Sequence, residues 1–276
     1  ELAWVESVWQ DIVAHHLFPE YGLGQAEVFA DPGEYRDDSG RETCATMEWL
    51  DLTNQLYEAT GEVRYAHQLE LTVYNALLSA QSSDGLRWCY YTPSRRADGK
   101  EWHHPPFFHG SVNCCFFSGP RAVARLPFYP CRLDREGIRI DFYEPLSATG
   151  LQLAGGAVGF TLDTAYPADG RVFITIAPER PQAFKLKLRL PPWATGITLA
   201  VNGQEAGVPL KAGEYAVLDR TWQNGDEVEL HLGLAVRLRR NPAMTGIVGA
   251  AIQRGPEVLA LDSRDNADLD LAAVTW

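Results

Sequence analysis

Hydrophobic positions in the first 130 residues recur every three or four residues, as they do on one face of an amphipathic helix. Three stripes of this kind run over residues 2–16, 45–59 and 66–80. Gly61 stands where a glycine commonly ends a helix. A fourth, short helix is predicted to begin at Pro120, with Ser118 or Gly119 as its cap, because proline is favoured at the first helical position. The pattern therefore predicts a helical region over residues 1–130.

From about residue 131 the period of the pattern becomes two. Apolar and polar residues alternate over residues 184–190, 197–202 and 227–232, as in strands with one buried and one exposed face. Asn202-Gly203 is a strong signal for a tight turn between two strands. Short strands at this spacing, without intervening helices, indicate a β-sandwich. We therefore expect an α + β multidomain chain, with a helical domain over residues 1–130 and an antiparallel β-sandwich over residues 131–276.

The composition is that of a folded, acidic protein. Of the 276 residues, 46% are hydrophobic and 22% charged, and 24 Lys and Arg against 36 Asp and Glu give a formal charge of −12. These values exclude a disordered or collagen-like chain. No nucleic-acid partner is expected, because such proteins present a basic surface to phosphates. No membrane partner is expected either, because the apolar runs are shorter than the roughly 18 residues of a membrane helix.

The five cysteines do not form a disulfide framework of the kind found in small secreted domains. Their number is odd, and Cys114 and Cys115 are adjacent. Cys89 and Cys131 are expected to be structural residues. Free thiols are typical of a reducing compartment, so a cytoplasmic location is expected. Metal binding or thiol chemistry is the better explanation of the remaining cysteines.

Glu42, Cys44, Cys114 and Cys115 form the sharpest candidate site. Three thiolates and one carboxylate can make a four-coordinate zinc site, and sulfur ligands disfavour Mg²⁺ and Ca²⁺. Glu42 and Cys44 are expected at a helix start, because residues two apart do not share a helix face. The adjacent cysteines are expected in a loop. Buried free cysteines can equally be ordinary core residues, so the spacing alone leaves both interpretations open.

Two further stretches carry candidate chemistry. Glu27 lies between apolar residues in an acid-rich loop, and such a setting raises the pKa of a carboxyl toward that of a general acid. An ordinary surface loop would explain the same residues. Residues 88–117 are rich in aromatic and imidazole side chains, which suit a sugar-binding cleft. The same side chains could instead pack the segment against the helices.

Several segments, in order, resemble glycoside hydrolase family 127, which is typified by β-L-arabinofuranosidases. The helical region carries Glu42-Thr43-Cys44-Ala45-Thr46, Tyr90-Tyr91-Thr92-Pro93, Cys114-Cys115 and Ser118-Gly119-Pro120-Arg121. The strand region carries Leu190-Pro191-Pro192-Trp193-Ala194, Val201-Asn202-Gly203 and Trp222-Gln223-Asn224-Gly225-Asp226. The Glu-Thr-Cys and Cys-Cys combination is specific, and the matching segments extend across nearly all of the chain.

The resemblance implies a zinc-dependent, retaining glycoside hydrolase that acts on β-L-arabinofuranosides or a related sugar. The Zn²⁺ ion would be held by Glu42, Cys44, Cys114 and Cys115. Of these, Cys114 would also be the nucleophile that attacks the sugar.

The other catalytic and binding residues also follow from the resemblance. The acid/base glutamate of the family lies shortly upstream of the Glu-Thr-Cys motif, where Glu27 matches best and Glu34 is the fallback. Tyr90 or Tyr91 would contact the substrate.

The family fold implied by the resemblance is an (α/α)6 barrel followed by β-sandwich domains. Such a barrel needs twelve helices, whereas the pattern predicts about four. We therefore expect residues 1–130 to be the C-terminal part of the barrel, with the N-terminal half-barrel supplied by a longer chain. The alternative is a truncated, non-catalytic module, in which a zinc-stabilised helical segment precedes a carbohydrate-binding β-sandwich.

Overall fold

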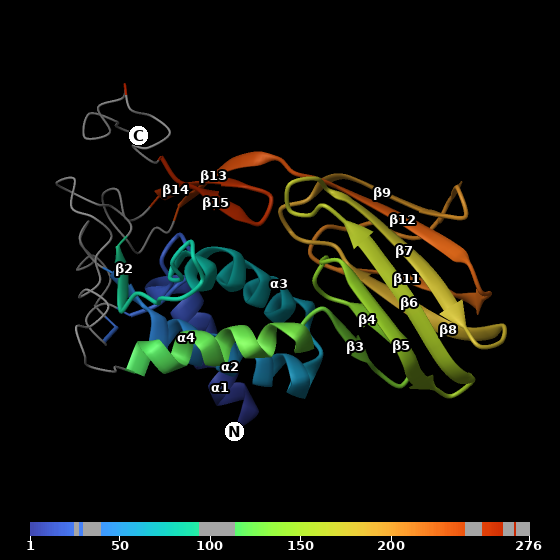
Figure 1. The fold of residues 1–276 in the computed structure, drawn as a ribbon, viewed down its shortest axis with the longest axis horizontal. Helices are drawn as coiled ribbons and strands as arrows, with labels where there is room; N and C mark the ends of the chain where they lie inside the picture. The colour runs from blue at the N-terminus through green and yellow to red at the C-terminus, as the bar shows by residue number, and fades with distance from the viewer. Residues whose placement is uncertain (25–27, 30–39, 94–113, 241–249, 262–267, 269–276) are drawn as a thin grey trace. The chain divides into compact units, whose positions relative to one another are not determined.

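The computed structural model describes residues 1–24, 28–29, 40–93, 114–240, 250–261 and 268 (Figure 1). The chain divides into two compact units. The helical unit comprises Glu1–Gly61, Gln68–Ala124 and Val236–Trp276, and the sheet unit comprises Glu62–His67 and Arg125–Ala235. In the described part of the chain, no helix is both long enough and apolar enough to cross a membrane.

The three predicted helical stripes are confirmed. The helices are α1 (Leu2–Asp11) with the π-helical turn η1 (Ile12–His16), α2 (Thr43–Thr60), α3 (Val63–Thr72) with the π-helical turn η2 (Val73–Leu77), α4 (Cys114–Arg125) and the short 3-10 helix η3 (Leu126–Phe128). Gly61 ends α2 in the left-handed conformation, with φ of 70°, which glycine adopts without steric cost. Its N–H donates to the carbonyl of Tyr57 at 2.7 Å.

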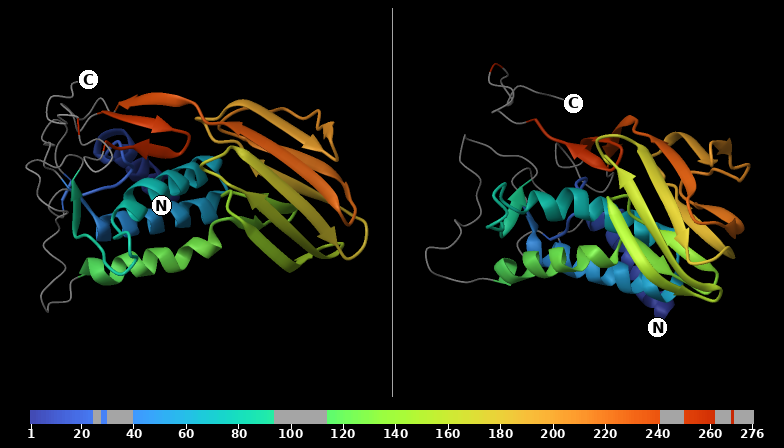
Figure 2. Two further views of the ribbon diagram at one scale, coloured as in Figure 1. Left: turned by 45° about the horizontal axis from the view of Figure 1, so that its top comes forward. Right: turned by 45° about the vertical axis from the view of Figure 1, so that its right-hand side comes forward.

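The helical unit has its own core. The rings of Trp9 on α1 and Trp49 on α2 stack with centroids 5.6 Å apart. The indole N–H of Trp9 donates to the hydroxyl of Thr53 at 3.0 Å, so the buried polar group of Trp9 has the partner that it needs. In both ribbon views α2 and α4 lie side by side (Figure 1, Figure 2). This packing brings the beginnings of α2 and α4 toward each other.

The predicted start of the last helix is wrong. The sequence favours a helix that begins at Pro120, whereas α4 begins at Cys114 and contains Pro120 in its interior. Proline lacks an N–H, so this position forgoes one helical hydrogen bond. The adjacent cysteines therefore lie in the first turn of a helix, not in a loop.

The C-terminal boundary of the strand region also differs from the prediction. Strands β13 (Val236–Arg240), β14 (Ala250–Arg254) and β15 (Glu257–Leu259) form a separate three-stranded sheet, which groups with the helical unit. Asn75 in η2 holds this sheet: its amide donates to the carbonyl of Pro256 at 2.9 Å and accepts from the N–H of Val258 at 2.7 Å. The alternating pattern identifies strands but does not identify the surface on which they pack.

The sheet unit contains two sheets. The six-stranded sheet has the order β10-β9-β12-β7-β6-β5, and the four-stranded sheet has the order β11-β8-β4-β3. Their strands are β3 (Cys131–Leu133), β4 (Gly137–Ile140), β5 (Leu146–Leu153), β6 (Gly156–Thr164), β7 (Arg171–Pro178), β8 (Gln182–Arg189), β9 (Thr195–Val201), β10 (Gln204–Glu205), β11 (Tyr215–Trp222) and β12 (Asp226–Gly233). All pairs are antiparallel except β4 with β8, which is parallel, so the expectation of a purely antiparallel region is corrected at this pair.

Alternation along the strands builds the core of the sheet unit. Every second residue of β7 is buried, and β8 and β12 bury alternate residues in the same way. The predicted turn at Asn202-Gly203 is confirmed: both residues have positive φ, 51° and 74°, as a two-residue hairpin requires, and it joins β9 to β10. The indole of Trp222 is buried and donates to the carbonyl of Phe184 at 3.0 Å.

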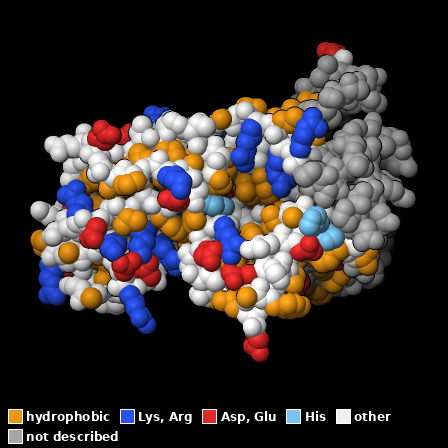
Figure 3. Space-filling view, turned by 180° about the vertical axis from the view of Figure 1, so that it is seen from behind, with side chains coloured by type: hydrophobic (Ala, Val, Ile, Leu, Met, Phe, Trp, Pro, Cys, Tyr) orange, Lys and Arg blue, Asp and Glu red, His pale blue; other side chains and the backbone are white. Residues whose placement is uncertain are grey.

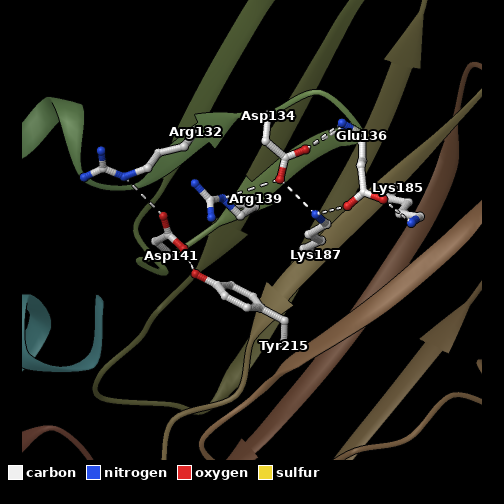
Figure 4. Close-up of polar contacts among 9 residues, drawn as sticks. Arg132, Asp134, Glu136, Arg139, Asp141, Lys185, Lys187 and Tyr215 are labelled. Carbon is white, nitrogen blue, oxygen red and sulfur yellow. Dashed lines mark hydrogen bonds and ion pairs between the residues drawn. The ribbon is translucent and has the colours of Figure 1, made fainter. Parts of the chain in front are cut away.

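Charged side chains follow the outer surface of the four-stranded sheet (Figure 4). Lys187 on β8 binds Asp134 at 2.8 Å and Glu136 at 2.6 Å, and Lys185 also pairs with Glu136. On the face drawn in Figure 3, Lys and Arg side chains lie interspersed with Asp and Glu side chains. Ion pairs at a protein surface add little stability each, so the buried apolar residues of the alternating strands carry the fold.

Candidate metal centre and nucleophilic site

A short two-stranded sheet positions the first two candidate ligands. Strand β1 (Gly40–Glu42) pairs antiparallel with β2 (Tyr91–Pro93). Glu42 ends β1 in extended conformation and is the N-cap of α2, so Cys44 falls in the first turn of that helix. The prediction that these two residues lie at a helix start is confirmed.

Thr43, between the two ligands, fixes the strand end. Its N–H donates to the carbonyl of Tyr90 at 3.1 Å, and its hydroxyl donates to the carbonyl of Cys89 at 2.7 Å. Both Thr43 and Glu42 are buried. These backbone contacts hold β1 against residues 89–90, which lie almost fifty residues later in the chain.

The four predicted ligands come together. Glu42 and Cys44 from the start of α2 and Cys114 and Cys115 from the start of α4 place one ligand atom each within 4.8 Å of all the others. The Sγ atoms of Cys44 and Cys115 are 3.3 Å apart, and those of Cys114 and Cys115 are 4.0 Å apart. The Sγ of Cys115 is 3.8 Å from a carboxylate oxygen of Glu42. Residues 71 positions apart therefore share one cluster.

The two adjacent cysteines are in different environments. Cys115 is fully buried, whereas Cys114 is exposed. Both lie in the first turn of α4, where the partial positive charge of a helix N-terminus favours thiolates. A thiol that solvent reaches can meet a substrate, and a buried one cannot.

The pKa values of the thiols follow these environments. Burial raises the pKa of Cys44 to about 11, and burial, with Cys44 beside it, raises the pKa of Cys115 far above its usual value. Burial also acts to raise the pKa of Cys114, but hydrogen bonds from Cys44, Tyr90 and Cys115 outweigh it and lower that pKa. The exposed thiol is thus the one that ionises most readily.

The tyrosine pair lies beside this thiol. The hydroxyl of Tyr90 is 3.6 Å from the Sγ of Cys114. The ring of Tyr91 lies against that of Tyr90, with centroids 4.6 Å apart, and Tyr91 stands opposite Glu42 in the β1–β2 pair. Sequence alone did not distinguish the two tyrosines, and in the described structure the hydroxyl of Tyr90 accepts a hydrogen bond from the Cys114 thiol.

Two features of the site were not found by sequence reasoning. Ser118, one turn along α4, has its hydroxyl oxygen 3.3 Å from the Sγ of Cys44. The second feature is an ion pair in which Arg41 of β1 contacts Glu20 at 2.9 Å, with both side chains largely shielded from solvent. The spacing of Ser118 from the adjacent cysteines was a usable signal, because residues three and four apart share a helix face. Nothing in the local pattern relates Glu20 to Arg41.

Several predicted residues lie outside the described part of the chain. They are Glu27 and Glu34, the two candidates for the acid/base, and the histidines and aromatic residues between residues 102 and 109. Cys89 is buried and Cys131 half-buried, and neither forms a disulfide among the described residues; their structural role stays a prediction.

Family models match most of the sequence. Residues 1–127 match the model described as Beta-L-arabinofuranosidase, GH127 catalytic domain. Residues 137–234 match the model described as Beta-L-arabinofuranosidase, GH127 middle domain. The boundary between the two models falls beside the boundary between α4 and the sheet unit.

Known proteins resemble the chain over most of its length. A non-reducing end beta-L-arabinofuranosidase of Bifidobacterium longum is 26% identical over 280 residues, which cover 94% of this chain and 41% of that protein. A solved structure of a GH127 beta-L-arabinofuranosidase from Geobacillus stearothermophilus T6 matches with a TM-score of 0.80 and 26% identity, over 92% of this chain and 42% of that one. A solved glycoside hydrolase matches with a TM-score of 0.82 and 27% identity, over 92% and 46%. The chain thus spans less than half the length of these relatives.

Proposed function

Because the chain belongs to glycoside hydrolase family 127, we propose that it carries the catalytic residues of a zinc-dependent, retaining glycoside hydrolase acting on β-L-arabinofuranosides or a related sugar. The observation that carries this proposal is the convergence of one carboxylate and three thiols within 4.8 Å. The substrate class comes from the relatives, whose names describe β-L-arabinofuranosidases.

The donor set fits Zn²⁺ in chemistry and in spacing. Zinc–sulfur bonds of about 2.3 Å in a tetrahedron place neighbouring sulfurs roughly 3.8 Å apart. The two Sγ–Sγ distances to Cys115, 3.3 and 4.0 Å, lie on either side of that value. Mg²⁺ and Ca²⁺ prefer oxygen ligands, so a site with three thiolates disfavours both ions. Bound zinc would keep the buried thiols deprotonated, against the upward shift of their pKa values, and would hold Cys114 in place.

The reaction we propose is a double displacement. The thiolate of Cys114 attacks the anomeric carbon as the bond from that carbon to the leaving oxygen breaks, and Glu27 donates its proton to that oxygen. Glu27 then takes a proton from water, whose oxygen bonds to the anomeric carbon and releases the thiolate. Two inversions give net retention. The role of Glu27 rests on the family resemblance.

Tyr90 is the tyrosine that we assign to this chemistry. Its hydroxyl lies 3.6 Å from the Sγ of Cys114, so it can donate to the thiolate before attack and remain beside the sugar afterwards. Tyr91 contributes its ring to the packing of Tyr90.

We extend the proposal to the architecture of the whole protein. The helices of the helical unit form part of an (α/α)6 barrel whose other helices lie in a longer chain, and the two sheets of the sheet unit form a β-sandwich. A cytoplasmic location agrees with five free cysteines in the described residues.

The test is hydrolysis of a chromogenic β-L-arabinofuranoside by the full-length protein. We expect activity in the zinc-loaded wild type and its loss in Cys114→Ala, by at least about 10³-fold, because the nucleophile is removed. Cys131→Ala, at a half-buried cysteine in the sheet unit, is the matched control and should retain activity. Hydrolysis by Cys114→Ala at the wild-type rate would refute the mechanism.

The alternative function is a non-catalytic module, in which the zinc-stabilised helical unit accompanies a carbohydrate-binding sandwich. The observation behind this alternative is that the chain spans less than half the length of its relatives. Equilibrium binding of arabinose-containing oligosaccharides to the chain, together with the absence of turnover by the full-length protein, would support the module. Turnover that depends on Cys114 would exclude it.

A further inference from the structure

We propose that Ser118 is a positioning residue of the metal centre, which donates a hydrogen bond to the Cys44 thiolate. The inference rests on the proposed zinc site and concerns a residue outside its four ligands. Ser118 lies on α4, four residues after Cys114 and three after Cys115, so it shares the helix face of both. Its hydroxyl oxygen is 3.3 Å from the Sγ of Cys44, which comes from α2.

The direction of this hydrogen bond is set by the state of the cysteine. In the thiol form, the S–H of Cys44 donates to the hydroxyl oxygen of Ser118. In the thiolate form, Cys44 has no proton to give, and the hydroxyl of Ser118 rotates to donate to sulfur. A hydrogen bond from a neutral donor to an anion is among the stronger kinds. The same pair of atoms thus serves both states, and it is strongest in the state that binds metal.

The local structure gives Ser118 no other reason to be serine. It is 7% exposed, and serine is less favourable than alanine inside a helix. A buried hydroxyl requires a partner, and the thiol of Cys44 supplies it. Cys115, on the same helix face, approaches the same sulfur at 3.3 Å. Ser118 and Cys115 therefore contact Cys44 from α4 together, and fix where its sulfur lies relative to the other ligands.

The consequence is a larger effect on metal affinity than on folding. Partners of metal ligands typically change metal affinity by about 10–100-fold when removed. Ser118→Ala takes away one oxygen atom and improves helix propensity, so the metal-free variant should fold. We expect its Zn²⁺ affinity to fall about tenfold or more, with all four ligands still in place.

The experiment measures Zn²⁺ affinity by competition with a chromophoric chelator, and records the thiolate-to-metal absorption of the Co²⁺-loaded protein. The matched control is Ser79→Ala, because the Ser79 hydroxyl bonds only to the carbonyl of Ala76, at 3.3 Å, among the contacts described. Ser118→Thr, which restores a hydroxyl, should recover most of the affinity. In Ser118→Ala the Co²⁺ spectrum should keep its three-thiolate intensity but shift in wavelength, whereas Cys44→Ala should lose intensity.

The outcomes separate the two proposals. A wild-type chain that binds neither Zn²⁺ nor Co²⁺ overturns the metal centre itself. A wild-type chain that binds zinc, with equal affinity in Ser118→Ala and Ser79→Ala, overturns only the role of Ser118. Loss of affinity in Ser118→Thr as large as in Ser118→Ala also overturns it, because the hydroxyl would then not be the group that matters.

Discussion

Cys114 and Cys115 are neighbours in the sequence, and the helix places them in different environments. Successive residues on a helix point about 100° apart, so one thiol of an adjacent pair can face the interior while the other faces outward. Cys115 is fully buried among Cys44 and Glu42, and Cys114 is exposed beside Tyr90. A loop would not hold the two directions so firmly. The first turn of α4 therefore presents one buried thiol and one accessible thiol, as the proposed ligand and nucleophile roles require.

Gly119 allows α4 to pack closely against the side chain of Trp88. A Cβ at this position would lie 2.1 Å from Cδ2 of Trp88, a buried side chain. Alanine normally stabilises a helix by about 1 kcal/mol relative to glycine, but overpacking costs about 1–3 kcal/mol. The overpacking cost less the gain in helix propensity predicts that Gly119→Ala lowers the free energy of unfolding by about 1 kcal/mol, as measured by denaturant titration.

The control for Gly119 uses the same two residue types on the same helix. Ala124 lies at an exposed position of α4, where only helix propensity operates. Ala124→Gly should destabilise the protein by about 1 kcal/mol. Stabilisation by Gly119→Ala would contradict the packing of Trp88 against this glycine.

At the scale of elements, the sequence predicted the helix ends and turns that depend on the conformation of one or two residues. Gly61 ends α2 because its left-handed φ needs glycine, and Asn202-Gly203 makes its hairpin turn for the same reason. Pro120 misled the prediction of α4, because the preference for proline in the first turn is local. The helix instead includes Cys115, which contacts Cys44, and Gly119, against which Trp88 packs, and both partners come from distant parts of the chain.

In the candidate site, the sequence predicted which residues carry donor atoms but not the contacts that depend on packing. The identities of Glu42, Cys44, Cys114 and Cys115 were visible as a motif, because donor chemistry belongs to residue types. The role of Ser118 was not visible, because it depends on where α2 lies relative to α4. The pattern also could not assign β13 to the helical unit, since alternation shows that a strand has a buried face and not what covers it.

Asn75 is the main polar anchor between η2 and the β14–β15 hairpin. Its amide is buried and serves the carbonyls of Leu71 and Pro256 and the N–H of Val258, at 2.7–2.9 Å. Asn75→Ala would leave these buried backbone groups unsatisfied, each at a cost of about 1–3 kcal/mol. We predict a loss of at least about 3 kcal/mol in the free energy of unfolding, and faster amide hydrogen exchange at Val258.

A second asparagine provides the comparison for Asn75. Asn54 on α2 donates a solvent-exposed hydrogen bond to the carboxylate of Glu58, one turn along the same helix, at 2.9 Å. Asn54→Ala should change stability by no more than about 0.5 kcal/mol and leave the exchange of Val258 unaltered. Equal effects of the two substitutions would contradict the anchoring role.

At the scale of the whole molecule, the chain passes between its two units more than once. The sheet unit takes Glu62–His67 from the beginning of α3 and then Arg125–Ala235. The short first piece contributes His67, whose Nδ1 is 3.0 Å from the guanidinium of Arg189 on β8. Arginine has no acceptor and stays protonated, so His67 must accept this hydrogen bond as a neutral imidazole. The folded state of the sheet unit therefore depends on an uncharged histidine.

His67 should make the stability of the protein depend on pH. Burial, and next the charge of Arg189, lower the pKa of His67 from 6.5 to about 3. The folded state then binds fewer protons than the unfolded state between these values, so stability is full above pH 6.5 and falls as the pH decreases toward 3. At pH 5 the loss from this group is about 2 kcal/mol. Thermal unfolding of the wild type between pH 7 and pH 5 measures it.

Carboxylates titrate at lower pH in any protein, so the contribution of His67 is read from a difference between variants. His67→Asn keeps an acceptor near the position of Nδ1 but cannot be protonated, and it should lose the part of the pH dependence that lies between pH 7 and pH 5. His231→Asn, at a half-buried histidine on β12, should keep the wild-type dependence. If His67→Asn falls in stability as steeply as the wild type, the neutral imidazole is not what links folding to pH, and the hydrogen bond from Arg189 would need a different explanation.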